Sequence, residues 1–595
     1  MPGFATFTAK TTMRSESSEK MTGFDFVIIG AGSAGCVLAN RLSANGKYRV
    51  LLLEAGRPDK NPWIHLPIGY AKTMHHPLDN WRFYTEPNAN LKDRKIYMPR
   101  GRTLGGSSSI NGLVYIRGQK ADYDHWAQLG NEGWSWDSCL PYFRKLEHND
   151  QGGSETRGSD GPVWASTVPA GDKLVDSFIA AGAANGVPVT HDFNSGDQEG
   201  VGYLQLSTKK GLRCSTAASY LKQARGRENL TVITGAHVTR IVFNGRKAEA
   251  VEFRREGRLD RVKASQEILL SAGAIQSPQI LQLSGVGSGA LLREHGVPAV
   301  HELVGVGENL QDHLQVRMMY EVGEPITIND DLNSLFGRAR IGLEWLFRRT
   351  GPLALGINKG AMFCRALPEV NDTPDTQFHF APLSAKSTAG KVDPFSGCTM
   401  SICQLRPESR GTVYIRSSDP LDPPRIQTNY LAAETDRRTT VAGMKFARRM
   451  SRTEPLAELL KREVTPGLQF QTDDELLDAA RELATTIFHP VGTAKMGRPE
   501  DRFAVVDSRL RVHGMEGIRV IDCSIMPTLI SGNTNVPAIM IAEKAADMIL
   551  ADTTKQKAIV EISTIKNAAT KRAASGHTVV PSGGSNAEAR QEHSQ

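Results

Sequence analysis

The chain of 595 residues is too long for one ordinary domain, and its formal charge is only +7, from 71 Lys and Arg against 64 Asp and Glu. With 40% hydrophobic and 23% charged residues, the composition is that of a globular protein, and no dense basic block indicates a nucleic-acid binder. No apolar run has the length of a membrane span, so we expect no transmembrane segment. Seven scattered cysteines indicate free thiols in a reducing compartment.

Residues 1–23 are rich in Ser, Thr and Lys and lack the apolar segment of a secretory signal. We expect a disordered tail there, because such a segment cannot bury enough apolar surface to offset its ordering entropy. The same reasoning applies to residues 551–595, where Ala, Ser, Thr, Lys and Gly dominate.

The first ordered element is a predicted strand, Asp25–Ile29, which runs into Gly30-Ala31-Gly32-Ser33-Ala34-Gly35 and then into a predicted helix over residues 36–42. This G-x-G-x-x-G spacing lets a pyrophosphate approach the backbone at the positive end of a helix. A second predicted strand, residues 49–53, ends in Glu54, whose carboxylate is placed to meet ribose hydroxyls. The segment predicts a dinucleotide site. Glu54 disfavours NADP, whereas FAD and NAD both remain compatible with this unit.

A second glycine-rich stretch covers residues 100–112. Gly101, Gly105 and Gly106 give it little side-chain bulk, and Ser107–Ser109 add hydroxyl groups. Such a loop can lie flat against a ring system or a pyrophosphate. Taken alone, it is more typical of a surface loop.

Further strands are predicted at Leu230–Thr234, Glu267–Ser271 and Ile518–Ile521, and with the helical patterns between them they indicate an α/β fold. The stretch from about Tyr320 to Phe488 mixes helices and strands with Pro-rich turns, which suggests a second domain. A helix is predicted over residues 537–550, with Pro537 in its first turn and Asn535 as a plausible cap.

Several spaced motifs resemble those of the glucose-methanol-choline (GMC) oxidoreductases. They are residues 100–112, 273–287 and 305–313, together with His489-Pro490-Val491-Gly492-Thr493, Asp522–Pro527 and Gly532–Asn535. The resemblance extends over residues 24–550 in the family's order, and it is strongest to bacterial acceptor-dependent alcohol dehydrogenases and next to choline dehydrogenases. It implies FAD as the cofactor, which settles the choice that the first motif left open.

The resemblance implies a Rossmann-like FAD-binding domain with a second, α+β substrate-binding domain. We assign residues 24–320 to the main part of the first domain and 321–488 to the second. Residues 489–550 would complete the FAD domain and the active site. The residues expected at the cofactor are Gly30, Gly32, Ser33, Ala34, Gly35, Glu54, Arg102, Gly105, Gly106, Ser107, Asn111, Gly112, Leu113, Val114, Val238, Asp522, Cys523 and Asn533.

The resemblance also implies the chemistry. His489 would remove the hydroxyl proton of an alcohol while hydride passes to flavin N5, because imidazole has a pKa near neutral. Asn533, with Asn535 as the alternative register, would orient that hydroxyl by hydrogen bonds. We expect His313 to affect cofactor retention or stability. The implied function is oxidation of a primary alcohol, aliphatic or aryl, to its aldehyde, with electrons passing to a quinone or another acceptor.

Departures from the family pattern refine these expectations. Ile110 stands where some members carry a flavin-linking His, so we expect FAD to be bound non-covalently. Lys359 stands near a position where a carboxylate would face a quaternary ammonium, which disfavours choline. Choline dehydrogenase and a non-redox, hydroxynitrile-lyase-like flavoprotein remain the alternatives. We expect no metal site, with His75-His76 a loop pair. The expected location is the cytoplasm, with peripheral association at the inner face of the membrane left open.

Overall fold

The computed structural model describes residues 23–386 and 391–574. Its contacts divide the chain into two units, the first ending at Ala546 and the second beginning at Asp547. Residues 1–22, nearly all of the first predicted tail, and residues 575–595, about half of the second, lie outside the described residues.

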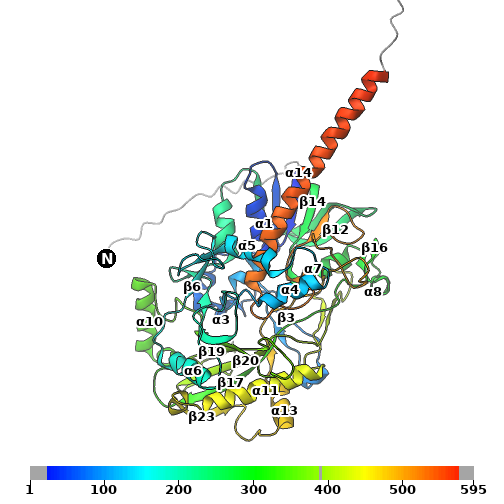
Figure 1. Ribbon diagram of the computed structural model, residues 1–595. Coiled ribbons are helices and arrows are strands. Elements are labelled where there is room, and N and C mark those ends of the chain that lie inside the picture. Colours follow the sequence, from blue (N-terminus) through cyan, green and yellow to red (C-terminus); the bar gives the residue numbers. More distant parts are fainter. Residues whose placement is uncertain (1–22, 387–390, 575–595) are drawn as a thin grey trace, which may run out of the picture. The chain divides into compact units, whose positions relative to one another are not determined.

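The first large sheet contains the predicted dinucleotide-binding strands (Figure 1). Its parallel part has the order β11-β2-β1-β14, with β25 also paired to β14, and β13 and β12 extend it as an antiparallel meander. All five predicted strands are confirmed, although β14 begins nine residues earlier than predicted, at Arg258. The strands are β1 (Phe24–Ile29), β2 (Val50–Glu54), β11 (Leu230–Thr234), β12 (His237–Asn244), β13 (Lys247–Arg255), β14 (Arg258–Leu270) and β25 (Ile518–Val520).

The second large sheet has the order β23-β17-β20-β19-β18-β7, with β24 also paired to β17. Alternate side chains of β17, from Leu314 to Val322, enter a hydrophobic core that also contains residues of α6, α11 and α13. The other face of β17 carries Gln315 and Arg317. The elements are β7 (Gly200–Tyr203), β17 (Leu314–Val322), β18 (Gly360–Cys364), β19 (Thr376–Ala381), β20 (Gly397–Gln404), β23 (Leu460–Thr465), β24 (Thr485–Thr486), α6 (Lys173–Ala184), α11 (Glu434–Ser451) and α13 (Asp473–Leu483).

Segments from both sides of the boundary predicted at residue 321 contribute strands to the second sheet. It recruits β7 from residues 200–203, and β17 already begins at Leu314. Helix α6, at residues 173–184, packs into the same core. Strand pairing between segments far apart in the chain leaves no local signal in composition, so a linear boundary at residue 321 does not coincide with the limits of this sheet.

The C-terminal helix α14 runs from Asn535 to Ala574. The prediction of disorder from residue 551 was therefore wrong for residues 551–574. That segment is rich in Ala and Lys, and such residues can support a helix without contributing large side chains to a core. Asn535 is the first helical residue, and its Oδ1 accepts a hydrogen bond from Ser33 Oγ at 2.8 Å.

Other elements complete the described part of the chain. The helices that matter below are α1 (Ser33–Ser43), which follows β1, and α7 (Gly273–Leu283), which follows β14. The remaining α-helices are α2 (Pro62–His65), α3 (Tyr70–Thr73), α4 (Lys120–Gln128), α5 (Trp136–Leu146), α8 (Gly289–Glu294), α9 (Ile328–Asn333), α10 (Leu335–Arg348) and α12 (Leu456–Leu459). The short strands are β3 (Phe83–Tyr84), β4 (Tyr97–Met98), β5 (Glu147–Asn149), β6 (Val163–Thr167), β8 (Gln205–Leu206), β9 (Thr208–Lys209), β10 (Leu212–Arg213), β15 (Val286–Gly287), β16 (His301–Glu302), β21 (Thr412–Tyr414) and β22 (Arg425–Gln427).

Candidate active site

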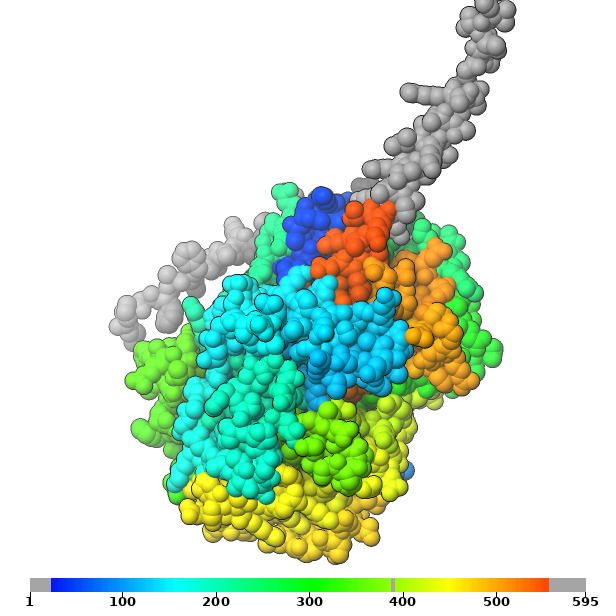
Figure 2. All heavy atoms as spheres, in the orientation of Figure 1, coloured from blue at the N-terminus to red at the C-terminus, as the bar shows by residue number. Residues whose placement is uncertain are grey.

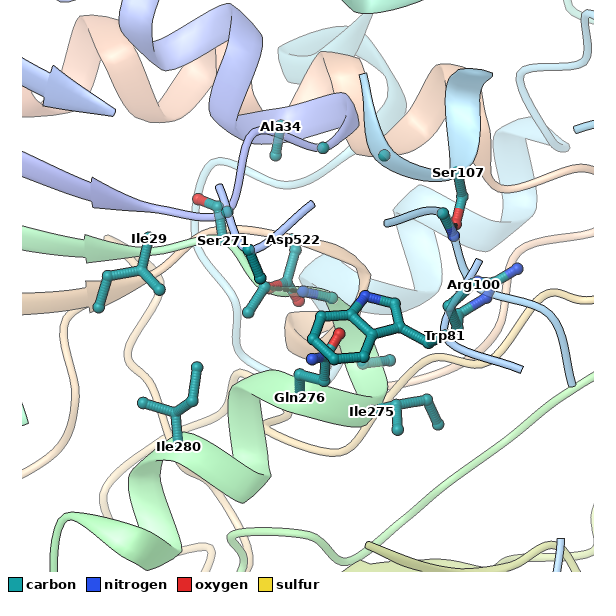
Figure 3. A pocket seen from close by; sticks show the side chains of 18 of the residues that line it. Ile29, Ala34, Trp81, Arg100, Ser107, Ser271, Ile275, Gln276, Ile280 and Asp522 are labelled. Carbon is teal, nitrogen blue, oxygen red and sulfur yellow. Dashed lines mark hydrogen bonds between the residues drawn. The ribbon is translucent and has the colours of Figure 1, made fainter. Parts of the chain in front are cut away.

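A cavity lies at the carboxyl ends of the parallel strands of the first sheet (Figure 3). Gly30 follows β1, Glu54 ends β2 and Ser271 follows β14, and all three line it. Its empty volume is about 1120 Å³, including the part open to solvent. The crevice beyond the carboxyl ends of such strands is the usual ligand site of an open α/β sheet.

Two glycine loops meet at this cavity. A Cβ atom on Gly32 would meet no heavy atom within 4 Å, so a side chain there would project into the open space that a ligand needs. A Cβ atom on Gly106 would lie 2.6 Å from Gly32 Cα, which shows how closely the second glycine-rich loop approaches the first. Gly30 has a φ of +94°, and a Cβ atom there would lie 2.6 Å from the Ser271 carbonyl oxygen.

Glu54 is buried at the cavity wall. Its Oε2 accepts a hydrogen bond from the Ala31 amide at 2.9 Å, and its Oε1 accepts one from Gly56 at 2.8 Å. Burial raises the pKa of this carboxyl to about 7, although the two backbone donors oppose the shift. Each oxygen keeps a lone pair, so the carboxylate can still accept hydroxyl groups of a ribose.

Two buried polar atoms of the wall lack a partner among the residues that the structure describes. They are Ser271 Oγ and His237 Nδ1, and both residues line the first cavity. Buried polar groups are nearly always hydrogen-bonded in folded proteins. These atoms therefore fit a polar ligand that would satisfy them.

A second cavity, with an empty volume of about 1780 Å³, opens from the first towards the second sheet. Six residues line both cavities: Ser33, Arg100, Ser107, Cys523, Thr534 and Ala538. Helices α1 and α14 both begin at this shared region, at Ser33 and Asn535, so two positive helix ends point to it. The joined cavities suit a long dinucleotide whose phosphates lie in the middle.

His489 and Asn533 both line the second cavity and contact each other. Asn533 Nδ2 lies 3.2 Å from His489 Nε2, and His489 Nδ1 lies 3.0 Å from His313 Nδ1. His313 Nε2 lies 3.0 Å from the Leu405 carbonyl oxygen, which can only accept, so this nitrogen carries the proton. Neutral His313 then accepts through Nδ1, and His489 must donate through its own Nδ1.

The consequence is a fixed tautomer of His489. Its Nε2 keeps the lone pair and faces Asn533 and the cavity. The backbone is held as well, because the His489 amide donates to Asp312 Oδ1 at 2.7 Å. His313, which we expected to act through stability or cofactor retention, contacts the His489 imidazole directly.

The imidazoles of His313, His379 and His489 are all buried in this part of the site, and burial keeps each of them neutral. Burial is the main cause that holds the pKa of His489 well below 6.5, and electrostatic repulsion of an added proton by His313, His379 and Arg100 contributes less. Burial lowers the pKa of His313 to about 4 and that of His379 to about 4. A base that is neutral at neutral pH is ready to accept a proton.

Most predicted site residues line the two cavities. The first is lined by Gly30, Gly32, Ser33, Ala34, Glu54, Gly106, Ser107, Val238, Asp522 and Cys523, and the second by Ser33, Ser107, Asn111, Gly112, Leu113, Val114, His489, Cys523 and Asn533. Gly35, Arg102 and Gly105 line neither.

Each of these three residues has another role. A Cβ atom on Gly35 would lie 1.9 Å from the Gly30 carbonyl oxygen, so this glycine allows helix α1 to pack against the turn. Arg102 places its guanidinium 4.6 Å from the ring centre of Trp81, which itself lines the first cavity. The Gly105 amide donates to the Ala31 carbonyl at 2.8 Å and joins the two loops.

Asp522 lines the first cavity but has its own partners. Its Oδ2 accepts from the Gly273 amide at 2.9 Å and from Ser277 Oγ at 2.6 Å, both in helix α7. Figure 3 shows Asp522 beside Ser271 at the back of the cavity. The side chain therefore caps α7 and fixes the cavity wall.

Sequence reasoning missed several residues of the site. Arg100 lines both cavities, and Trp81 and Gln276 line the first (Figure 3). Gln279 lines the first cavity as well. Tyr70, Arg317 and His379 line the second. Residues 273–287 had been matched as a family motif, which was a signal for Gln276 and Gln279. The other residues stand outside the quoted motifs, except Arg100 at the start of one.

Comparisons with known proteins agree with this geometry. Two family models described as GMC oxidoreductase match residues 24–315 and 407–542. The chain belongs to the GMC oxidoreductases. The alcohol dehydrogenase (acceptor) of Pseudomonas putida is 44% identical over 531 residues, covering 89% of this chain and 96% of the relative.

Two further relatives show the range of the family. The oxygen-dependent choline dehydrogenase of Photobacterium profundum is 41% identical over 537 residues, covering 89% of this chain and 94% of the relative. The crystal structure of pyridoxine 4-oxidase from Mesorbium loti has a TM-score of 0.80 and 31% identity, covering 88% of this chain and 99% of that one. This GMC oxidoreductase is an FAD-dependent enzyme that oxidises alcohols.

The residues present fit FAD. The Gly32 cradle, the Glu54 carboxylate and the unpaired Ser271 Oγ belong to the end that would hold the ADP half. The larger cavity beside His489 and Asn533 would hold the flavin. Within residues 23–386 and 391–574, no helix is long and apolar enough to cross a membrane, and no cluster of three metal-ligating side chains occurs.

Proposed function

We propose that this enzyme oxidises a primary alcohol, aliphatic or aryl, to its aldehyde, and that a quinone or another acceptor receives the electrons. The observation that carries the proposal is the series of hydrogen bonds from Leu405 through His313 to His489, which leaves Nε2 of His489 with a lone pair rather than a proton at the cavity. The named activity of the Pseudomonas putida relative, alcohol dehydrogenase (acceptor), supports the substrate and acceptor classes.

The chain's own residues would bind and deprotonate the alcohol. The substrate hydroxyl enters between His489 Nε2 and Asn533 Nδ2, accepts a hydrogen bond from the amide and donates its proton to the imidazole. Gln377 Nε2 donates to Asn533 Oδ1 at 3.3 Å, which holds the amide with its NH₂ group towards His489. FAD, when bound, supplies the acceptor for the hydride that leaves the carbinol carbon.

We propose that FAD is held non-covalently. Ile110 is buried, 6% exposed, and lines the second cavity with a side chain that contains no nucleophilic atom. Cys523 is the thiol at the cavities, and burial raises its pKa to about 12, so little thiolate is present at neutral pH.

Choline is disfavoured as the substrate, but for a different reason from the one that the sequence suggested. Lys359 forms an ion pair with Asp172 at 2.7 Å and does not line the cavity. The cations that do line it are Arg100 and Arg317, and no described Asp or Glu does. A quaternary ammonium would meet positive charge here with no carboxylate to balance it.

We further propose that helix α10 docks the enzyme on an anionic membrane, where a lipid-soluble quinone is available. Leu335, Phe336, Leu343, Leu346 and Phe347 are between 55% and 83% exposed. They follow a helical spacing, so together they form an apolar stripe on the solvent side of α10. Monomeric proteins rarely expose a contiguous apolar patch without a use for it.

The charges of α10 favour anionic lipid as the occupant of this stripe. The helix contains three arginines and one acid, Glu344, and Arg349 follows at its end. An amphipathic helix with an apolar stripe and basic edges is typical of a segment that lies in the membrane interface. Figures 1 and 2 show α10, in green, at the left margin of the first unit.

Helix α10 is also linked to the second cavity. Leu332 lines that cavity three residues before α10 begins, and Ile357 lines it again nine residues after α10 ends. Docking through α10 would therefore place the mouth of the cavity near the lipid. We assign the enzyme to the cytoplasm, at the inner face of the membrane, because all seven cysteines are free thiols.

The experiment that tests the proposed function is anaerobic mixing of the FAD-bound enzyme with a panel of alcohols, choline included. Loss of the flavin absorbance with primary alcohols, and aldehyde in equal amount, supports alcohol oxidation. A hydroxynitrile-lyase-like protein would cleave a cyanohydrin with no bleaching by any alcohol. Preferential bleaching by choline would favour the choline alternative.

A further inference from the structure

One charged side chain in the second cavity has no role in the steps above. Arg317 lies on β17, on the face opposite the hydrophobic core, and lines the cavity. Its guanidinium has no hydrogen bond and no ion pair with any residue that the structure describes. An Arg side chain in a cavity wall without an acidic partner is unusual, because desolvating a charge is costly unless it is paired.

The surroundings of Arg317 add hydrogen-bond donors. Ser401 on β20 stands directly opposite Arg317 in the sheet, and His379 stands opposite Ser401 on β19. Ser401 and Tyr70 line the cavity with Arg317, and the positive charges of Arg317 and then Arg213 reach the Tyr70 hydroxyl. Together the guanidinium and the hydroxyls make a site that fits an anion, and Arg binds carboxylates with two parallel hydrogen bonds.

Two exposed lysines are adjacent in sequence to residues that line the cavity. Ala385 and Val392 line the cavity, and their neighbours in the chain, Lys386 and Lys391, are exposed. The carboxylate next in sequence, Asp393, is buried and does not line the cavity. A cleft lined by one sign of charge attracts ligands of the opposite sign.

We propose that Arg317, assisted by Ser401, binds the carboxylate of a substrate that carries both an alcohol and a carboxylate. The proposal rests on the proposed alcohol oxidation and names the substrate class for that same site. The substrate's hydroxyl lies at His489, and its carboxylate lies at Arg317, further along β17.

The position of Arg317 sets the spacing between the two groups. Arg317 is four residues beyond His313, which touches His489, and at about 3.3 Å per residue this separates the two backbone positions by about 13 Å. The Arg side chain, folded back along the strand, covers part of this separation, and a chain of methylene groups in the substrate would cover the rest. The substrate is therefore an ω-hydroxy acid with an apolar chain between its ends, and Ile68, Met74 and Leu332 supply apolar wall for that chain.

The test compares three substrates of one chain length: ω-hydroxyhexanoate, its methyl ester and hexanol. Anaerobic bleaching of the flavin, without any quinone, gives the rate and affinity of substrate oxidation alone. For the wild-type enzyme we expect kcat/KM for the acid to exceed that for the ester. In Arg317→Met we expect the acid-to-ester ratio to fall about 10- to 100-fold, the range for a hydrogen bond to a charged group. Arg317→Lys should retain part of the ratio, because it keeps the charge but loses the bidentate geometry.

The controls separate this inference from the proposed function. Arg261→Met removes an exposed arginine from β14 and should leave the ratio unchanged. Calorimetric titration with hexanoate, a non-reacting acid, should show binding that is weakened in Arg317→Met. An ester that matches the acid in the wild type, or an unchanged ratio in a flavin-replete Arg317→Met, overturns the inference while alcohol oxidation stands. If none of the three alcohols and no other alcohol bleaches the flavin, the proposed function itself fails.

If Arg317→Met does not retain FAD, the wild-type comparison of acid with ester still decides the inference. If Arg317→Met changes only the rate of flavin reoxidation by a quinone, the arginine binds the electron acceptor. This result would also contradict the inference. Weak binding of glycolate, in which the hydroxyl and carboxylate are adjacent, tests the predicted spacing. Oxidation of glycolate as fast as that of ω-hydroxyhexanoate would overturn it.

Discussion

His489 and His313 lie with their Nδ1 atoms 3.0 Å apart, although 176 residues separate them in the chain. The Leu405 carbonyl fixes the proton on the far nitrogen of His313, so His489 must donate to His313 and keep its Nε2 lone pair for the cavity. In the proposed mechanism, His313 is therefore a positioning residue that sets the tautomer of the base, His489. The arrangement explains how a buried imidazole is held ready without an acidic partner.

His313→Phe should slow anaerobic flavin reduction, because His489 Nδ1–H loses its acceptor and the productive tautomer is no longer fixed. Electrostatic repulsion between His313 and His489, when both are protonated, also contributes to the lowered pKa of His489, so without His313 the acidic limb of the rate profile should move to higher pH. His313→Asn keeps a carbonyl oxygen as an acceptor and should recover part of the rate. Equal rates and pH profiles for wild type and a flavin-replete His313→Phe would contradict the positioning role.

The pH dependence of the wild type follows from the direction of the shift at His489. Its pKa lies well below 6.5, so the neutral, active form dominates from pH 6.5 upwards. Activity is lost only as the pH falls through the lowered pKa, because protonation then removes the lone pair. Stopped-flow measurement of flavin reduction should show no inflection at or above pH 6.5. An inflection there that disappears in His489→Ala would show that the base titrates in its ordinary range.

Non-covalent FAD makes a simple prediction. Acid or heat precipitation should release all the yellow flavin into the supernatant, because Ile110 offers no nucleophile. Ile110→His would place an imidazole at the cavity wall, and part of the flavin in that variant could then remain with the pellet. Flavin that stays with the precipitated wild-type chain would refute the prediction, and Cys523→Ser would then show whether the thiol forms the bond.

The role of α10 is tested with lipid vesicles. The enzyme should sediment with vesicles that contain anionic lipid, and Phe336→Ser with Phe347→Ser should reduce the bound fraction about tenfold or more, since each Phe loses about 1.5–3 kcal/mol of burial. Leu259→Ser, at an exposed apolar residue of β14, is the matched control and should bind like the wild type. Equal vesicle binding by the wild type and the double variant would contradict membrane docking through α10. A wild-type enzyme that self-associates, with a double variant that does not, would instead assign the stripe to contact between copies of the chain.

Local motifs of the sequence were sufficient for the nucleotide half of the site. Gly30 to Glu54 form one strand–turn–helix–strand unit, so residues that act together are also close in sequence. His489 and Asn533 were assigned through the family resemblance, since a lone histidine in an apolar setting carries no local sign of catalysis. The structure brings the two side chains into contact.

What could not be predicted depends on pairing between distant segments. Arg317 and Ser401 face each other only because β17 pairs with β20. Lys359 is a cation, as the argument against choline required. It pairs, however, with Asp172, 187 residues away in the chain, and does not line the cavity. The exposed stripe of α10 looks in sequence like an ordinary core-facing stripe, because helical spacing does not say which side faces solvent.

The most direct test of the account is the rate of flavin reduction in His489→Ala, measured anaerobically with a saturating primary alcohol. We predict a loss of about 10²–10⁴-fold with FAD still bound, the usual contribution of a general base. Asn533→Ala should lose less, about 1–3 kcal/mol for one hydrogen bond to the reacting oxygen. His125→Ala, at an exposed histidine of α4, should react like the wild type. A flavin-replete His489→Ala enzyme that is reduced at the wild-type rate would show that the base lies elsewhere.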